Sequence, residues 1–133
     1  MKKLFYPAIF HKAEEGGFWI TFPDLPECIT EGDDMEEAYN MAVDALGLTL
    51  TDRIKSKEEL PKASDIENIE KQEDGVIVVV QFDKAEYDRR HNSRAVKKTL
   101  TIPEWLNEEA ISLNINFSQV LQDALIQKIR AKL

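Results

Sequence analysis

Three polar residues at alternate positions late in the sequence have the chemistry to read DNA bases. Lys97, Thr99 and Thr101 alternate with Leu100 and Ile102 in the run AVKKTLTIPEWL. A period of two is typical of a β-strand and places the three polar side chains on one face. Lysine donates to guanine O6 and N7, and threonine bonds either kind of base edge or contacts the thymine methyl group. We therefore interpret residues 97, 99 and 101 as candidates for base contacts.

The charge around this strand fits the same interpretation. Residues 89–98 carry five basic side chains and no acidic one. Arg94 and Lys98 within this run are expected to attract DNA phosphates without regard to sequence. The alternative for this run and for the polar strand face is an ordinary solvated surface.

Two short helices are predicted after the strand. Pro103 ends the strand and suits the first position of a helix, which Asn114 would close in a left-handed conformation. Asn116 reads as the N-cap of a second helix, with Gln119 completing a capping box. Free amides at Asn116, Phe117 and Ser118 could hold a phosphate, although capping alone would explain Asn116.

A strand and two helices over residues 95–133 form a unit too small to bury its own apolar faces. A two-fold symmetric homodimer would cover these faces, with the strand pairing with its copy in an antiparallel ribbon backed by four helices. Such a ribbon fits the major groove of double-stranded DNA. Residues 95–133 are therefore predicted to dimerise and bind DNA.

The preceding residues predict a separate small α+β domain over residues 1–83. Strands are expected at 3–12, 17–22 and 28–32 as a three-strand meander, with Gly16 and Gly17 in the first turn. A capping box of Asp34 and Glu37 starts a helix that runs to about Lys55. A surface connection follows, and the apolar run 76–82 predicts a strand buried on both faces. The charged residues 84–94 are interpreted as a linker.

Charge and composition limit what this first domain can bind. The chain has a formal net charge of −8, and residues 13–52 hold eleven carboxylates with no lysine or arginine. This segment should repel nucleic acid and suit a basic partner. With one cysteine and two isolated histidines, no disulfide, cysteine-based zinc site or cofactor is expected. No signal peptide or membrane span is recognisable, so the cytoplasm is the expected compartment.

Two known families are resembled in tandem. The segment VKKTLTIPEWLNEEAISLNINFSQVLQDAL resembles the ribbon-helix-helix repressors. The segment YPAIFHKAEEGGFWITFPDLPECITEGDDMEEAYNMAVDAL resembles the HicB antitoxins, and its specific parts are Gly17-Phe18-Trp19, Phe22-Pro23-Asp24-Leu25-Pro26-x-Cys28, Thr30-x-Gly32 and Glu37-Ala38. The sequence departs from these patterns at Glu27, where many relatives have glycine, and in a first C-terminal helix about one turn shorter than in the best-known ribbon repressors.

The resemblance implies an antitoxin that also represses its own operon. Its N-terminal domain would have a partial ribonuclease H fold and would block HicA, a small basic toxin that cleaves mRNA with a catalytic histidine. Its C-terminal dimer would bind operator DNA, and toxin and antitoxin would form a heterotetramer or a larger assembly. From charge alone, the candidate toxin-binding residues are Asp24, Glu27, Glu31 and Asp33.

Two other classes of function compete with this interpretation. A ribonuclease-H-like nuclease needs several carboxylates that converge on two metal ions. The first strand contains no acid, and Asp24, Glu31 and Asp83 are scattered, so no catalytic residue is predicted. Cys28 with His11 lacks a third orienting group for nucleophilic catalysis. The remaining alternative is a transcriptional repressor whose N-terminal domain senses a small ligand.

Overall fold

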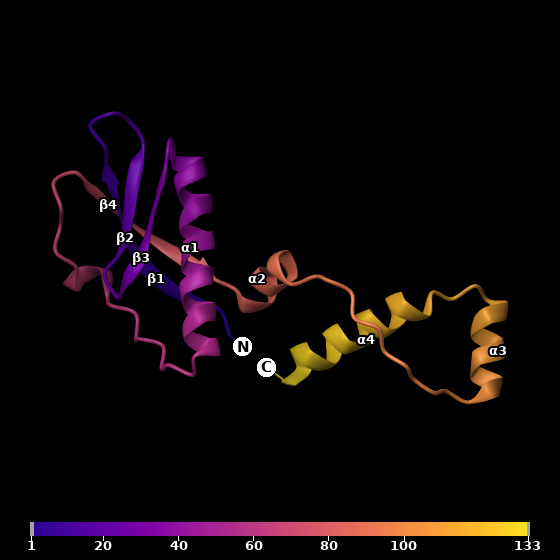
Figure 1. The fold of residues 1–133 in the computed structure, drawn as a ribbon. Coiled ribbons are helices and arrows are strands. Elements are labelled where there is room, and N and C mark those ends of the chain that lie inside the picture. Colours follow the sequence, from indigo (N-terminus) through magenta and orange to yellow (C-terminus); the bar gives the residue numbers. More distant parts are fainter. Residues whose placement is uncertain (1, 133) are drawn as a thin grey trace. The chain divides into compact units, whose positions relative to one another are not determined.

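The computed structural model describes residues 2–132 and divides into two compact units, Met1–Ser93 and Arg94–Leu133. The first unit contains β1 (Leu4–Lys12), β2 (Phe18–Phe22), β3 (Leu25–Gly32), α1 (Met35–Lys55), the 3-10 helix η1 (Ile66–Asn68), β4 (Gly75–Phe82) and α2 (Lys84–His91). The second unit contains α3 (Glu104–Ser112) and α4 (Phe117–Lys132) (Figure 1). The α+β class predicted for the N-terminal domain is confirmed. The likeness to a ribonuclease H fold stays a prediction.

The first unit is built on one antiparallel sheet in the order β3-β2-β1-β4. Its first three strands form the predicted meander, and β4 returns to pair along the whole of β1. The turn between β1 and β2 contains Gly16 and Gly17, which both have positive φ angles, 94° and 76°. Glycine adopts this left-handed backbone without the steric cost that a side chain would add.

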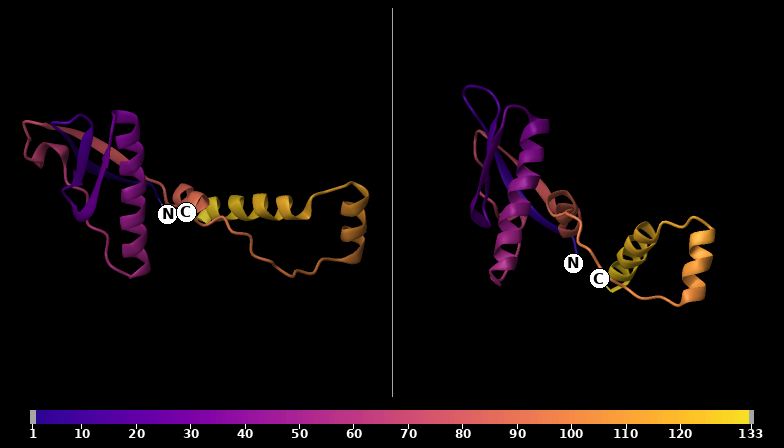
Figure 2. Two further views of the ribbon diagram at one scale, coloured as in Figure 1. Left: turned by 45° about the horizontal axis from the view of Figure 1, so that its top comes forward. Right: turned by 45° about the vertical axis from the view of Figure 1, so that its right-hand side comes forward.

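The core of the first unit lies between this sheet and α1, which covers one face in all the views (Figure 2). Period-two alternation sends Tyr6, Ala8 and Phe10 of β1 toward the helix. Their partners at three- and four-residue steps along α1 are the buried Ala38, Ala42, Leu46 and Leu50. Met35 and Tyr39 lie at the exposed margin of this apolar stripe.

The predicted N-cap of α1, Asp34, is confirmed. The Asp34 carboxylate accepts a hydrogen bond from the Glu37 backbone amide at 2.8 Å. The Glu37 carboxylate accepts from the amide of Asp33 at 3.3 Å, one residue before the N-cap. The first hydrogen bond satisfies an amide of the first turn that has no partner within the helix, whereas in a complete capping box Glu37 would bond the amide of Asp34.

Two strand predictions need correction, and both errors concern edge strands. β3 begins at Leu25 rather than at residue 28, and Pro26 lies inside it. Proline is tolerated there because β3 is an edge strand, whose outward amides have no partner in the sheet. β4 is also an edge strand, and its Val76 and Val79 are exposed, so it is not buried on both faces.

Much of the predicted linker forms a helix. Residues 84–91 fold into α2 because Asp83 caps the amide of Glu86 at 3.3 Å and the pairs Lys84–Asp88 and Glu86–Arg90 span one turn. Tyr87 anchors α2 to α1 and packs against the core. The charged pairs lie on the solvent side, so the sequence of α2 looks like a linker although one aromatic residue holds it to the domain.

The second unit has the predicted helices and caps. Asn114 adopts φ 55°, its amide donates to the carbonyl of Ile111, and the amide of Ile115 donates to Ala110, both at 3.0 Å. This is the left-handed closure expected for α3. Asn116 accepts from the Gln119 amide at 3.0 Å, as an N-cap should. The capping box is incomplete, because the Gln119 side chain donates to Asp123 instead. Pro103 is the N-cap of α3, one position before the expected one.

Residues 92–103 of this single chain form no helix or strand, so the predicted strand over residues 97–102 is not formed here. In the predicted ribbon, this strand forms by pairing with the same segment of a second chain. No side chain described in the second unit is buried, and its exposed large apolar residues are Val96, Leu100, Ile102, Trp105, Leu106, Ile111, Leu113, Ile115, Phe117, Val120, Leu125, Ile126 and Ile129. Across residues 2–132, no helix is long and apolar enough to cross a bilayer.

Candidate functional site

The sheet face turned away from α1 is only partly covered. Side chains at alternate positions of the strands share this face, here called the outer sheet face. The strand register places Ile29, Thr21, Ile9 and Ile77 in one row across it, and Glu31, Trp19, His11 and Gly75 in the next. Ile9 and His11 are buried, whereas Trp19, Ile29 and Glu31 are exposed at the β2–β3 side.

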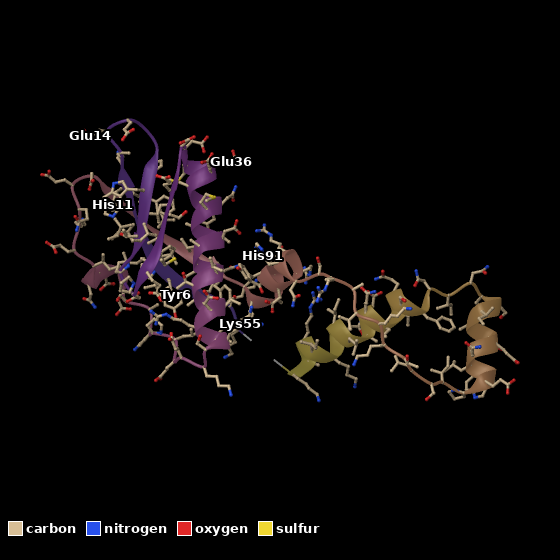
Figure 3. The ribbon with its side chains drawn as sticks, in the orientation of Figure 1. Tyr6, His11, Glu14, Glu36, Lys55 and His91 are labelled. Atoms are coloured by element: carbon tan, nitrogen blue, oxygen red, sulfur yellow. The ribbon has the colours of Figure 1, made fainter. Side chains whose placement is uncertain are left out.

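The side chains of Trp19 and His11 stack on the outer sheet face. Their rings are stacked with centroids 3.7 Å apart and an angle of 12° between the planes. His11 is only 6% exposed, and its Nε2 lies 3.0 Å from Oγ1 of Thr21. Its Nδ1 lies 3.7 Å from a carboxylate oxygen of Asp74, on the loop before β4. Figure 3 shows His11 on the opposite side of the sheet from α1, which carries Glu36 and Lys55.

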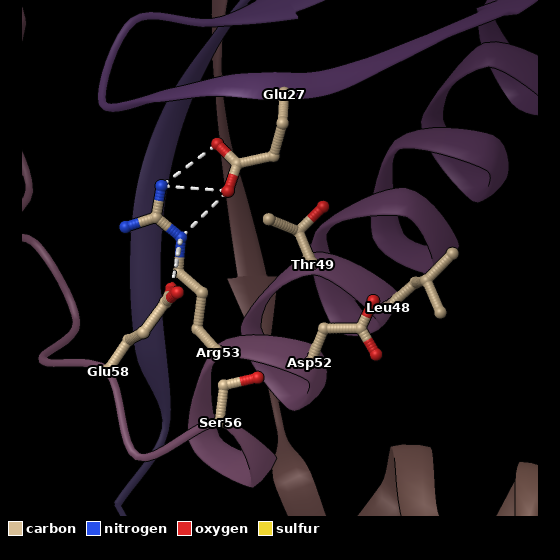
Figure 4. A pocket seen from close by; sticks show the side chains of 7 residues that line it. All are labelled: Glu27, Leu48, Thr49, Asp52, Arg53, Ser56 and Glu58. Carbon is tan, nitrogen blue, oxygen red and sulfur yellow. Dashed lines mark hydrogen bonds and ion pairs between the residues drawn. The ribbon is translucent and has the colours of Figure 1, made fainter.

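Two of the predicted toxin-binding carboxylates are engaged within the domain. Asp24, in the turn between β2 and β3, accepts hydrogen bonds from the backbone amide and the hydroxyl of Ser64. Glu27 accepts two hydrogen bonds from the guanidinium of Arg53 on α1, at 2.8 and 2.9 Å (Figure 4). A hydrogen bond from its own backbone, with help from Arg53, lowers the pKa of the Glu27 carboxyl. Asp24 thus joins the β2–β3 turn to the connection that follows α1, and Glu27 joins β3 to α1, so both residues have a structural role.

The other two carboxylates lie at the opposite end of β3. Glu31 stands directly across from Trp19, and Asp33 follows β3 before the helix cap. Both are exposed. The four residues therefore do not form one cluster. The structure separates an internally paired end, with Asp24 and Glu27, from an open end with Glu31 and Asp33.

The residues considered for catalysis are also apart. Cys28 is buried beneath α1, while His11 lies on the outer sheet face, so the sheet separates them. Burial raises the pKa of the Cys28 thiol. Asp24 and Glu31 lie at opposite ends of β3, and Asp83 caps α2. Within residues 2–132, no three His, Cys, Asp or Glu side chains gather in a way that could hold a metal ion.

The DNA-binding candidates all belong to the second unit. Arg94, Lys97, Lys98, Thr99 and Thr101 are exposed along the segment that precedes α3. Asn116 caps α4, and Phe117 and Ser118 form its first turn. The first group therefore precedes α3, and the second opens α4. Their roles in DNA binding stay a prediction.

Sequence reasoning gave no function to two residues that the structure makes prominent, Trp19 and Tyr87. A signal for Trp19 was present, since alternation in FWITF places it on the face opposite Phe18 and Ile20. Tyr87 gave no comparable signal, because its partner is Gly47, a residue without a side chain. Its contact depends on how closely two distant helices approach.

Known proteins resemble this chain in sequence and in fold. Antitoxin HicB 1 of Photorhabdus laumondii is 41% identical over 61 residues, a match that spans 46% of this chain and 39% of that protein. A chain of a toxin–antitoxin complex from Streptococcus pneumoniae is 32% identical with a TM-score of 0.60, and the match covers 96% of this chain and 99% of that one. The antitoxin HicB of Burkholderia pseudomallei shares the fold at 20% identity, with a TM-score of 0.55 over 94% of this chain and 98% of that one.

The family described as the HicB-like antitoxin of bacterial toxin–antitoxin systems matches residues 6–129 and thus spans both units. The motif residues lie within this match, which also covers the sheet from Tyr6 of β1 onward and the whole of α1. The chain belongs to the HicB-like antitoxin family.

Proposed function

We propose that this chain is the antitoxin of a HicA/HicB pair, and that its first unit binds and neutralises a small basic HicA-type toxin. The observation that carries this proposal is the match to the family over residues 6–129. The likeness to a chain of the S. pneumoniae toxin–antitoxin complex, over nearly all of both chains, supports it. Eleven carboxylates without a basic residue over residues 13–52 give the first unit the charge that a basic partner requires.

The second unit binds operator DNA as a homodimer in this proposal. Its support is the row of exposed apolar side chains on α3, α4 and the segment before them, which a single copy leaves uncovered. Pairing of residues 97–102 with a second copy would cover Leu100 and Ile102 and turn Lys97, Thr99 and Thr101 toward the major groove. Arg94 and Lys98 would add phosphate contacts, and the N-terminus of α4 would fix the register.

Co-expression tests the first half of this proposal. The HicA-type toxin of the same operon should arrest growth when expressed alone, and this chain should restore growth and co-purify with it. A chain that neither restores growth nor co-purifies would refute the antitoxin function. Purified chain should also retard a DNA fragment that carries its own promoter, with an affinity that falls steeply as salt rises. No retardation at low salt would refute the second half.

A further inference from the structure

We propose that Trp19 and Glu31 form a subsite on the outer sheet face that takes a lysine or arginine side chain of the toxin. This inference rests on the proposed antitoxin function and specifies where the toxin is held. It assigns a binding role to Trp19, which would otherwise only cover His11, and it favours one of the four carboxylates selected from charge.

The two side chains are neighbours by strand register. Trp19 of β2 and Glu31 of β3 are directly opposite in an antiparallel pair, so they project from the same face with Cβ atoms about 4.5–5.5 Å apart. Trp19 is 43% exposed. The Glu31 side chain is exposed and makes no ion pair or hydrogen bond with any residue in the range 2–132. An aromatic face and a free carboxylate thus stand side by side.

The indole is held in place before any partner arrives. One side of it stacks on His11, whose own position is fixed by burial and by the Thr21 hydroxyl. A side chain that is already ordered loses little conformational entropy on binding. The other side of the indole can accept a cation, and tryptophan is the strongest aromatic partner for lysine or arginine. Glu31 supplies the opposite charge beside it.

The surroundings favour a basic protein over other occupants. Ile29, diagonal to Trp19 and 64% exposed, adds apolar contact of the kind that surrounds an aromatic anchor in protein interfaces. Nucleic acid would be repelled by the carboxylates of residues 13–52. The first unit of a second copy would present the same acidic segment over residues 13–52 and would be repelled as well. A lysine or arginine side chain of a basic toxin would be attracted by the Glu31 carboxylate and could pack against the indole of Trp19.

Binding of the purified toxin to the full chain tests the subsite by titration calorimetry. Trp19→Ala should raise Kd about 10- to 100-fold, the range for an aromatic anchor. Trp19→Phe keeps a ring on His11 and should cost less, about 3- to 10-fold. Glu31→Gln should raise Kd about 3- to 10-fold at low salt, and this difference should shrink near 0.5 M salt because exposed charges are screened.

A matched pair on the other side of the sheet serves as the control. Tyr39 and Glu36 are an exposed aromatic residue and an exposed acid on α1. Tyr39→Ala and Glu36→Gln should leave Kd within about twofold of wild type, because changes outside the subsite cost little. Thermal unfolding of each variant verifies that the fold is retained, and Glu31→Gln, which keeps its shape, decides the question if Trp19→Ala unfolds.

The results of these titrations distinguish the proposed Trp19–Glu31 subsite from the proposed antitoxin function. If wild type binds the toxin and Glu31→Gln and Trp19→Phe bind equally well, the subsite is refuted while the antitoxin function stands. If the α1 pair weakens binding instead, the toxin lies on α1 and the subsite is again refuted. If wild type shows no binding, both proposals fall.

Discussion

The ring of Tyr87 on α2 lies directly over Gly47 on α1. A Cβ atom built on Gly47 would come within 2.3 Å of the Tyr87 ring, so the two helices approach more closely than any side chain at position 47 would allow. Phe82 and His91 flank the ring, with centroids 6.2 and 4.2 Å away. Burial raises the pKa of the Tyr87 hydroxyl, and Asp44, Asp52 and Asp88 raise it further.

Gly47→Ala tests this contact, because two effects on stability oppose each other. Alanine favours a helix interior over glycine by about 1 kcal/mol, whereas overpacking typically costs about 1–3 kcal/mol. We expect the clash to prevail and α2 to be displaced. Trypsin should then cleave faster after Arg89 and Arg90, and urea unfolding should show no net stabilisation. Stabilisation by the full helix-propensity gain, with unchanged cleavage, would contradict the contact.

The double variant Gly47→Ala with Tyr87→Ala is the control for that experiment. Removing the ring removes the clash, so adding the alanine to a Tyr87→Ala background should raise the free energy of unfolding by about 1 kcal/mol. The sign of the alanine effect should therefore differ between the two backgrounds. Equal effects in both would show that the residues do not interact.

The acid side of the stability curve should depend on Glu27. The pKa of its carboxyl is lowered in the folded state, so its contribution to stability is complete above the unfolded pKa of about 4.3. The contribution is lost as pH falls through the lower, folded value. Because Glu27 and its partner Arg53 are partly exposed, we expect less than about 1 kcal/mol.

Urea unfolding of wild type and Glu27→Gln between about pH 6 and pH 3 measures this contribution. The wild type should be the more stable at pH 6, and the difference should narrow toward pH 3 as Glu27 is protonated. Asp34 and Glu37 remain in both proteins, so acid loss of the α1 cap cancels in the comparison. A difference that stays constant over this range would show that the Glu27–Arg53 pair does not stabilise the packing of β3 against α1.

Most strands of the first unit and its helix α1 could be predicted from local patterns, whereas α2 and the contacts between distant residues could not. Alternation in β1 and β2 and the Asp34–Glu37 cap of α1 are local, and the structure confirms them. The position of β4 at the sheet edge depends on which strand it joins, and an apolar run does not encode that choice. The charged residues of α2 gave no sign of a helix, because its one anchor, Tyr87, packs over a glycine on α1 that lies far away in the sequence.

The candidate site was predictable only in part, for a similar reason. The charge pattern located the acidic segment. It could not show that Asp24 and Glu27 are bonded to Ser64 and Arg53 within the domain, whereas the Glu31 carboxylate makes no such contact among the described residues. That separation follows from the register of β2 and β3 and from the path of the connection between α1 and β4.

Replacing both Thr99 and Thr101 with alanine tests whether the strand face that carries Lys97, Thr99 and Thr101 contacts the DNA bases. Loss of both hydroxyls should weaken binding to the operator of the same operon by about 0.5–1.5 kcal/mol for each hydroxyl that bonds a base edge, with toxin neutralisation unchanged. The salt dependence of binding should persist, because Arg94 and Lys98 remain to contact phosphates. Unchanged mobility shifts for this variant would refute the ribbon assignment.

Two truncations test where the first unit ends and where the chain dimerises. A chain that ends at Ser93 retains α2 and should sediment as a monomer that still binds the toxin. A chain that ends at Asp83 lacks Tyr87 and should unfold at a lower urea concentration, since it leaves the surface around Gly47 uncovered. The full chain should sediment as a dimer, and a monomeric full chain would contradict the proposed ribbon.

The inhibition of RNA cleavage tests the proposed antitoxin function most directly. Purified full chain is titrated into a fixed concentration of the HicA-type toxin of its operon, and cleavage of an mRNA is followed on a gel. Cleavage should fall to zero as the chain reaches the toxin concentration, and Glu31→Gln should require more protein at low salt. Cleavage that continues in a large excess of folded wild-type chain would contradict the function proposed for this protein.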